Sequence, residues 1–347
     1  MNNVQILDYP QCKICISPDY NFFFSKKNGF FARWGETKED DPQYAPSVEL
    51  LDIEISEGYC SGNCRWCYKS NGSNELRRYM SLKTFRKLWS KIPNTVCQVA
   101  LGICDIDSHP KLWQICQFLR EEKGVIPNLT CNGLGVTDEV AQKASQLLGA
   151  VAVSIVNKES SYNAIQKFTD VGMKQVNIHF VLAEETFEKA KQVVQDISTD
   201  SRLSKLNAIV FLQFKPKGKG KQSGYHSLRD VNKYRELIQL CEQLGVAYGF
   251  DSCSAGIYLS AIKDRPNYDK LSEYVEPCES SLFSFYINCN GFGFPCSFVE
   301  GESEWEQGID ILNCNDFHKD VWTNPRLIKW RRRLLNNGRS CFVYNLE

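Results

Sequence analysis

The chain reads Cys60-Ser61-Gly62-Asn63-Cys64-Arg65-Trp66-Cys67 directly after a strand-like run at residues 48–55. Three thiols therefore share one polar loop, a setting that is unusual for buried structural cysteines. An iron–sulfur cluster with three protein ligands keeps one iron open for another ligand. A zinc site would normally need a local fourth Cys or His, and the next cysteine after the loop is Cys97. The loop therefore predicts a three-cysteine [4Fe–4S] site.

Composition limits the possible classes of protein. A chain of 347 residues can hold one large domain and a smaller one. The 16 cysteines would suit a disulfide-rich secreted protein, but the first residues show no signal peptide. We therefore expect reduced thiols and a cytoplasmic location. Lys plus Arg and Asp plus Glu number 41 each, which argues against a broad nucleic-acid-binding surface. No apolar run is long enough to span a membrane.

Short β-rich runs alternate with helical patterns from about residue 48 to residue 245. The predicted strands are 49–55, 96–102, 126–131, 150–155, 175–182 and 207–214. The predicted helices are 82–91, 110–123, 137–148, 161–171, 185–197 and 228–244. Six β-α units predict a parallel sheet with crossover helices, either a partial barrel or an open doubly wound sheet. In both, the cysteine loop lies at the carboxyl end of a strand, where ligands bind.

The two ends of the chain differ from this middle part. Residues 1–46 contain aromatic runs at 20–24 and 30–35 that flank Asn28-Gly29, which predicts a hairpin. Ahead of them, Cys12 and Cys15 fit an ordinary reduced pair better than half a metal site. Residues 246–347 are aromatic, rich in turns and contain six cysteines, which predicts a smaller metal-bearing region. The middle domain then covers residues 47–245.

The cysteine loop has the spacing C-x-x-x-C-x-aromatic-C, with Trp66 as the aromatic residue. It resembles the cluster loop of the radical S-adenosylmethionine (radical SAM) enzymes. The resemblance implies an α/β fold with a partial (β/α)6 barrel, and a [4Fe–4S] cluster held by Cys60, Cys64 and Cys67. In that family the open iron binds SAM, and the reduced cluster cleaves it to a 5′-deoxyadenosyl radical that abstracts hydrogen from a substrate. An electron donor such as flavodoxin or ferredoxin is implied. The substrate, a peptide or a small molecule, is not specified.

Matching the family strand by strand adds five SAM-binding candidates. Gly102 and Asp105 stand where the family carries a Gly-Gly-Glu-like segment, although only one glycine is kept here. Asn132 follows the third strand, Ser154 ends the fourth, and Trp66 matches the position that packs beside adenine. The alternative interpretation is that Asp105 caps the next helix, and that Asn132 and Ser154 only form turns.

A second cysteine set follows residue 245. A hairpin with Asn290-Gly291 at its turn would bring Cys278 and Cys296 together. The C-x(12)-G-x(4)-C form resembles the start of SPASM and twitch domains, which carry auxiliary [4Fe–4S] clusters. The resemblance implies a second auxiliary cluster, with ligands Cys253, Cys278, Cys296 and Cys341. Cys314 is the reserve fourth ligand, Cys289 is a bystander, and a structural zinc is the competing interpretation.

Other polar residues have plainer interpretations. His179 and Gln213 lie in predicted strands, where such residues are more often satisfied core residues than catalysts. Lys215, Lys217, Lys219 and Lys221 predict a solvated basic loop. The function favoured is a radical SAM enzyme. The alternative is a non-enzymatic iron–sulfur or zinc-binding protein on the same scaffold. The segment from Gly102 to Asp105 supports this alternative, because it keeps only one glycine of the family pattern.

Overall fold

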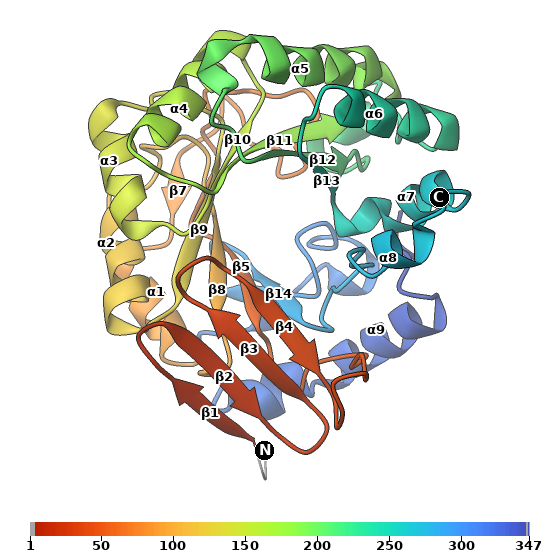
Figure 1. The fold of residues 1–347 in the computed structure, drawn as a ribbon. Coiled ribbons are helices and arrows are strands. Elements are labelled where there is room, and N and C mark those ends of the chain that lie inside the picture. Colours follow the sequence, from red (N-terminus) through yellow and green to blue (C-terminus); the bar gives the residue numbers. More distant parts are fainter. Residues whose placement is uncertain (1–3, 345, 347) are drawn as a thin grey trace.

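The computed structural model describes residues 4–344 and 346. Its centre is a ten-stranded sheet in the order β13-β12-β11-β10-β9-β8-β5-β14-β15-β16 (Figure 1). From β5 to β13 the neighbours are parallel, and their spatial order follows their order in the chain. A doubly wound sheet would reverse direction at a switch point, so this order defines a singly wound partial barrel. The predicted fold class is confirmed.

All six predicted β-α units are present. The strands are β5 (Leu50–Glu54), β8 (Gln98–Gly102), β9 (Ile126–Cys131), β10 (Val151–Ser154), β11 (Val176–Leu182) and β12 (Ala208–Gln213). The helices are α1 (Leu82–Trp89), α2 (Leu112–Gln117) with its π-helical continuation η1 (Phe118–Glu122), α3 (Asp138–Leu147), α4 (Lys158–Asp170), α5 (Phe187–Thr199) and α6 (Val231–Gln243). Helix α4 begins three residues before its predicted start, because the Asn157 side chain accepts a hydrogen bond from the Ser160 amide and caps it there.

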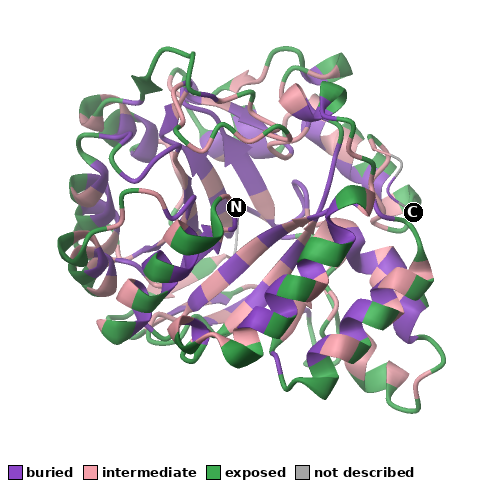
Figure 2. Ribbon diagram, turned by 90° about the horizontal axis from the view of Figure 1, so that it is seen from above, coloured by how far each residue is buried: buried purple, intermediate pink, exposed green. Residues whose placement is uncertain are grey.

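Side chains alternate along the parallel strands. On β11, Ile178 and Phe180 are buried against the outer helices, whereas His179 and Val181 face the inside and are partly exposed. Figure 2 shows the same division, with buried strands at the centre and exposed residues on the outer side of the helices. The apolar core thus lies between sheet and helices, and the inside of the barrel remains accessible.

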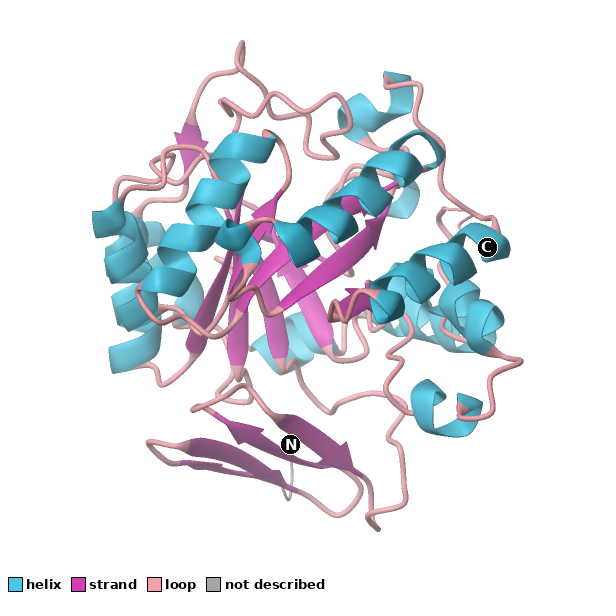
Figure 3. Cartoon of the chain, turned by 45° about the horizontal axis from the view of Figure 1, so that its top comes forward, coloured by secondary structure: helices cyan, strands magenta, loops and turns pink. Residues whose placement is uncertain are grey.

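The N-terminal region forms its own antiparallel sheet: β1 (Gln5–Asp8), β2 (Cys12–Ile16), β3 (Asn21–Ser25) and β4 (Phe31–Trp34). The predicted hairpin is β3–β4, and β1 and β2 extend it. Buried Lys13 donates to the carbonyl oxygen of Val96 (2.6 Å), just before β8 begins. This sheet therefore covers the amino ends of the barrel strands, as Figure 3 shows below the central sheet.

The C-terminal region continues the barrel sheet. Strand β14 (Ser284–Ile287) pairs in parallel with β5, and β15 (Phe292–Phe294) and β16 (Ile309–Asp310) follow antiparallel. The predicted turn is present, with Gly291 at a φ of +81°. Beyond β12, β13 (Tyr248–Phe250) adds a seventh parallel strand, so parallel pairing continues past residue 245.

Short elements complete the described chain: β6 (Ser56–Glu57), β7 (Arg78–Tyr79), η2 (Glu184–Thr186), η3 (Ser201–Leu203), η4 (Gly218–Gln222), η5 (Ser252–Ser254), α7 (Ala255–Ile262), α8 (Tyr268–Ser272), η6 (Ser303–Trp305), η7 (Phe317–Trp322) and α9 (Pro325–Asn336). Among the described residues, no helix is both long and apolar enough to cross a membrane.

Candidate functional site

The cysteine loop leaves the carboxyl end of β5 and turns back on itself. The Asn63 amide donates to the carbonyl oxygen of Cys60 (3.3 Å), and the Cys67 amide donates to that of Cys64 (3.2 Å). Asn63 adopts a φ of +41°, in the left-handed region that Asn tolerates. Two successive turns therefore present three partly exposed thiols from one short segment.

Asp105 holds this loop against the rim of the barrel. Its carboxylate accepts hydrogen bonds from the Ser61 amide (2.9 Å), the Ser61 hydroxyl (2.8 Å) and Asn132 Nδ2 (2.7 Å). Both Asp105 and Asn132 are buried. The helix-cap alternative for Asp105 is wrong, because α2 begins only at Leu112 and Lys111 stands at its N-cap. Asp105 is therefore a clamp between the loop and the ends of β8 and β9.

At Gly62 and Gly102, neighbouring groups lie so close to the backbone that a larger side chain would have little room. A Cβ on Gly62 would lie 3.3 Å from Asn132 Nδ2 and 3.5 Å from Cys60 Sγ. A Cβ on Gly102 would lie 3.3 Å from the Cα of Glu54 on the adjacent strand. Ser154 ends β10 on the same rim, opposite His179 in the β10–β11 register. The structure thus places Gly102, Asn132 and Ser154 on the rim that carries the cysteine loop.

Trp66 lies on the other side of the loop. Its ring stacks on Tyr225, with centroids 5.4 Å apart and an interplanar angle of 16°. Beside it, Arg65 donates to the carbonyl oxygen of Ser223 (3.2 Å). The segment after β12 therefore forms an aromatic wall beside the cysteines. Tyr225 was missed by sequence reasoning because no motif surrounds it.

A fourth thiol, Cys104, was also missed. It is buried just beyond the end of β8, and its interaction with the Cys60 thiol lowers the pKa of Cys60. The Cys64 thiol differs from that of Cys60, because burial raises the pKa of Cys64 to about 12. The sequence gives one indication of Cys104: it lies between Gly102 and Asp105, which are both SAM-binding candidates.

Cys60, Cys64 and Cys67 are the thiols that would hold the [4Fe–4S] cluster implied by the resemblance. Three reduced thiols on one partly exposed loop match a cluster that has three protein ligands and an open iron. Within residues 4–344 and 346, no three Cys, His, Asp or Glu side chains are arranged to hold a single metal ion. The number and partial exposure of the three thiols therefore fit a cluster with three protein ligands.

The second set of cysteines is gathered from four segments. Cys253 interacts electrostatically with Cys278 and Cys296, and Cys341 interacts with these last two. Burial raises the pKa of Cys278 to about 12 and that of Cys296 to about 11. These are the four residues named as auxiliary ligands.

The two remaining cysteines of this region lie elsewhere. Cys314, the reserve ligand, is buried in the main core and interacts with Lys91 and acidic side chains instead. Cys289 lies in the same core, and its amide donates to Glu54 Oε2 (3.4 Å).

The prediction of a solvated basic loop is wrong for its first half. Lys215 and Lys217 are only 4% and 6% exposed. Lys215 donates to Asp251 Oδ2 (3.1 Å) and to the sulfur of Cys253, and its ammonium lies 4.4 Å from the centroid of the Phe298 ring. The lysines were misread because their carboxylate and thiol partners are distant in sequence.

A buried polar network connects the cysteine loop with the C-terminal region. Lys69 Nζ contacts Glu54 Oε2 (3.1 Å), the Glu300 carboxylate and the Tyr286 hydroxyl (2.8 Å). Burial alone would lower the pKa of Lys69, but Glu54 and Glu300 raise it. The network fixes the segment that follows Cys67 against β14.

An aromatic contact runs alongside this network. Tyr68 stacks on Phe298 with ring centroids 4.5 Å apart. Tyr68 directly follows Cys67, and Phe298 lies two residues after Cys296. The two cysteine sets are therefore joined by direct side-chain packing.

The inside of the barrel is polar. Burial lowers the pKa of His179 to about 4, opposed by Asp251, so His179 is neutral near pH 7. Burial raises the pKa of Asp52 to about 6. Gln213, in contrast, is buried, and its Nε2 donates to the carbonyl oxygens of Leu228 and Leu346 (3.1 and 2.8 Å). Its Oε1 has no hydrogen-bond partner among the described residues, so Gln213 is a core residue that is only half satisfied.

A partial barrel with a three-thiol loop on its carboxyl rim is the architecture of radical SAM enzymes, and the comparisons agree. SuiB of Streptococcus suis, bound to the precursor peptide SuiA, matches with a TM-score of 0.71 and 12% identity, over 94% of this chain and 90% of that one. anSMEcpe, with AdoMet and the Cp18Cys peptide, matches with a TM-score of 0.59 and 14% identity, over 81% and 82%.

Both of these proteins are radical SAM enzymes with SPASM or twitch domains. SuiB bound to S-adenosylmethionine matches with a TM-score of 0.62 and 13% identity, over 82% of this chain and 68% of that one. No protein-family model matches the sequence, and no curated protein matches it. At these identities the comparisons establish the fold, which is that of radical SAM enzymes.

Proposed function

We propose that the protein is a radical SAM enzyme that cleaves SAM to generate a radical for hydrogen abstraction. The observation that carries this proposal is the loop of Cys60, Cys64 and Cys67, clamped by Asp105 and Asn132 on the carboxyl rim of a partial barrel. When bound there, the cluster supplies the electron that cleaves SAM. The chain contributes the positions of its ligands and the aromatic wall beside them.

The surrounding residues have distinct roles in this proposal. Trp66, stacked on Tyr225, offers an aromatic face to the adenine of SAM. Gly102 and Ser154 line the rim where the rest of SAM would lie. Asp105 already accepts three hydrogen bonds, so we assign it to hold the loop rather than to bind the SAM amino group alone. This assignment differs from the role that the family motif implies.

We further propose a peptide substrate and an auxiliary [4Fe–4S] cluster. SuiB and anSMEcpe are both bound to peptides in the matching structures, which supports a peptide over a small molecule. Cys253, Cys278, Cys296 and Cys341 supply four thiols, and Lys215 offsets part of their charge. A ferredoxin or flavodoxin would supply electrons, and reduced thiols suit the cytoplasm.

The decisive test is SAM cleavage by anaerobically reconstituted protein. Replacing any one of Cys60, Cys64 and Cys67 by Ala should abolish formation of 5′-deoxyadenosine, because the cluster loses a thiolate. The matched control is Cys12→Ala, a partly exposed cysteine on β2 that should leave cleavage unchanged. The circular dichroism spectrum should be unchanged in all variants. Cleavage by all three loop variants would contradict the proposal.

The alternative is a metal-binding protein without SAM chemistry. The reduced glycine content of the Gly102–Asp105 segment is the feature that favours it. Protein that holds a full complement of iron but makes no 5′-deoxyadenosine with dithionite would support this alternative.

A further inference from the structure

The outer face of α9 is strongly basic in a chain whose net charge is zero. The helix carries Arg326, Lys329, Arg331, Arg332 and Arg333 and no acidic residue. Arg331 is buried and donates to backbone carbonyl oxygens of Ser281 and Trp322, so it has a structural role. The other four cations remain on or near the surface.

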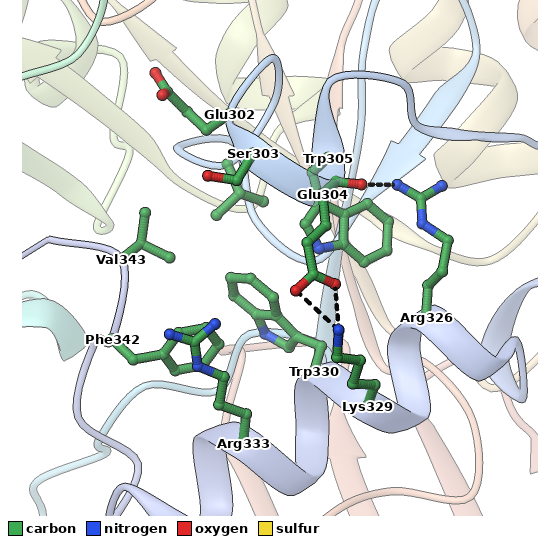
Figure 4. A pocket seen from close by; sticks show the side chains of 11 residues that line it. Glu302, Ser303, Glu304, Trp305, Arg326, Lys329, Trp330, Arg333, Phe342 and Val343 are labelled. Atoms are coloured by element: carbon green, nitrogen blue, oxygen red, sulfur yellow. Dashed lines mark hydrogen bonds and ion pairs between the residues drawn. The ribbon is translucent and has the colours of Figure 1, made fainter.

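A pocket of about 170 Å³ lies against this helix. Its walls are aromatic: the Trp330 ring lies 4.5 Å from that of Phe342 and 6.2 Å from that of Trp305, centroid to centroid. Figure 4 shows Arg326, Lys329, Trp330 and Arg333 projecting from α9 toward the facing loop. The volume is below the range of about 300–1,000 Å³ that is usual for small-molecule sites. It suits one side chain of a docked protein.

The charges around the pocket do not cancel. Glu304 is neutralised by Lys329 (3.0 Å), and Glu302 by Lys221 (2.8 Å). Arg333 lies over the Phe342 ring at 4.2 Å. Arg326 and Arg333 line the pocket and form no ion pair within the part of the chain that the structure describes. Arg332 does not line the pocket, but it is exposed next to Arg333 and is also without an ion pair among the described residues. The rim of the pocket is therefore positively charged and complementary to an acidic surface.

The pocket also adjoins the C-terminal cysteine set. Phe342 directly follows Cys341 in the chain. On the other wall, the Val299 amide donates to the carbonyl oxygen of Cys296 (3.2 Å). Two of the four cysteines thus lie on segments that form the pocket, and an electron entering there would have a short path to a cluster at these thiols.

We propose that this face of α9 is the docking surface for an acidic electron-carrier protein of the ferredoxin type. The proposal rests on the auxiliary cluster of the proposed function. One electron passes from the reduced carrier to the oxidised cluster; the carrier is oxidised, the cluster is reduced, and no covalent bond is made or broken. Small, weak interfaces steered by charge are typical of electron-transfer partners.

The test uses the Cys60/Cys64/Cys67 triple-Ala protein, reconstituted without oxygen, so that only the C-terminal cluster remains. Reduced ferredoxin is mixed with it in a stopped-flow instrument, and reduction is followed by visible absorbance. Arg332→Gln with Arg333→Gln should slow reduction about tenfold at low salt, because charge steering is lost. The difference should fade at high salt.

The matched control is Lys83→Gln with Lys189→Gln, which removes the same charge from exposed positions on α1 and α5. Reduction by ferredoxin should then change less than twofold, and reduction by dithionite should be equal in all proteins. Equal ferredoxin rates for the two double variants would overturn the docking site alone. Triple-Ala protein without iron would overturn both the auxiliary cluster and this proposal, and the iron count shows this before mixing.

Discussion

The two cysteine sets of this protein are built in opposite ways. Cys60, Cys64 and Cys67 lie within eight residues, and two local turns present them. The C-terminal set draws Cys253, Cys278, Cys296 and Cys341 from segments spread over almost ninety residues. The first site is thus encoded by one loop, and the second exists only when the fold brings its segments together.

This difference has a thermodynamic consequence. A metal bound at the local loop adds little to the folding of a barrel that already has a large core. A metal bound at the dispersed set ties together chain segments that otherwise have few regular elements, so its binding free energy contributes directly to folding. The two sites should therefore respond differently to the loss of metal.

Removing the two sets in turn tests this directly. The Cys60/Cys64/Cys67 triple-Ala protein should keep about four irons, the content of one cuboidal cluster. Adding Cys278→Ala and Cys296→Ala should remove that iron and lower the melting temperature by on the order of 10 °C. Elemental analysis and calorimetry on anaerobic protein measure both effects. Zinc in place of iron in the triple variant would contradict the auxiliary-cluster assignment but leave the SAM site untouched.

The same contrast explains how much the sequence could predict. The barrel was predictable because each β-α unit is a local pattern, and the cysteine loop because its spacing is a motif. The network of Lys69, Glu54, Tyr286 and Glu300 was not, since it joins two pairs of residues that lie more than two hundred residues apart in the chain and carry no motif. Likewise, the continuation of the sheet through β14 depends on long-range pairing with β5.

Breaking that network should weaken the connection between the two regions. Lys69→Met leaves the carboxylates of Glu54 and Glu300 without their cation, and removing one partner of a buried pair costs about 3–5 kcal/mol. The free energy of unfolding in urea measures the loss. Lys205→Met, which removes an exposed pair with Asp170, should cost less than about 1 kcal/mol. Equal losses for both variants would refute a structural role for the network.

Asp105→Asn should act on the first region alone. The substitution keeps the shape of the side chain but removes its charge and places an N–H group toward Ser61 and Asn132. Partners that orient metal ligands typically contribute 10–100-fold to metal affinity or activity. We expect a loss of SAM cleavage in that range, with the C-terminal iron retained. Asp107→Asn, at an exposed neighbouring position, is the control; an equal loss there would show that Asp105 is not specific.

Asp52 lies between the two regions, since it interacts electrostatically with both Tyr68 and Glu279. Burial raises its pKa from 3.8 to about 6. A carboxyl whose pKa is higher in the folded state keeps its proton there longer than in the unfolded chain, so stability falls as pH rises from about 4 to about 6. Asp52→Asn should remove up to about 3 kcal/mol of that fall. Urea unfolding of the metal-free protein at pH 4 and pH 7 measures the difference, and an unchanged pH dependence in the variant would place the titrating group elsewhere.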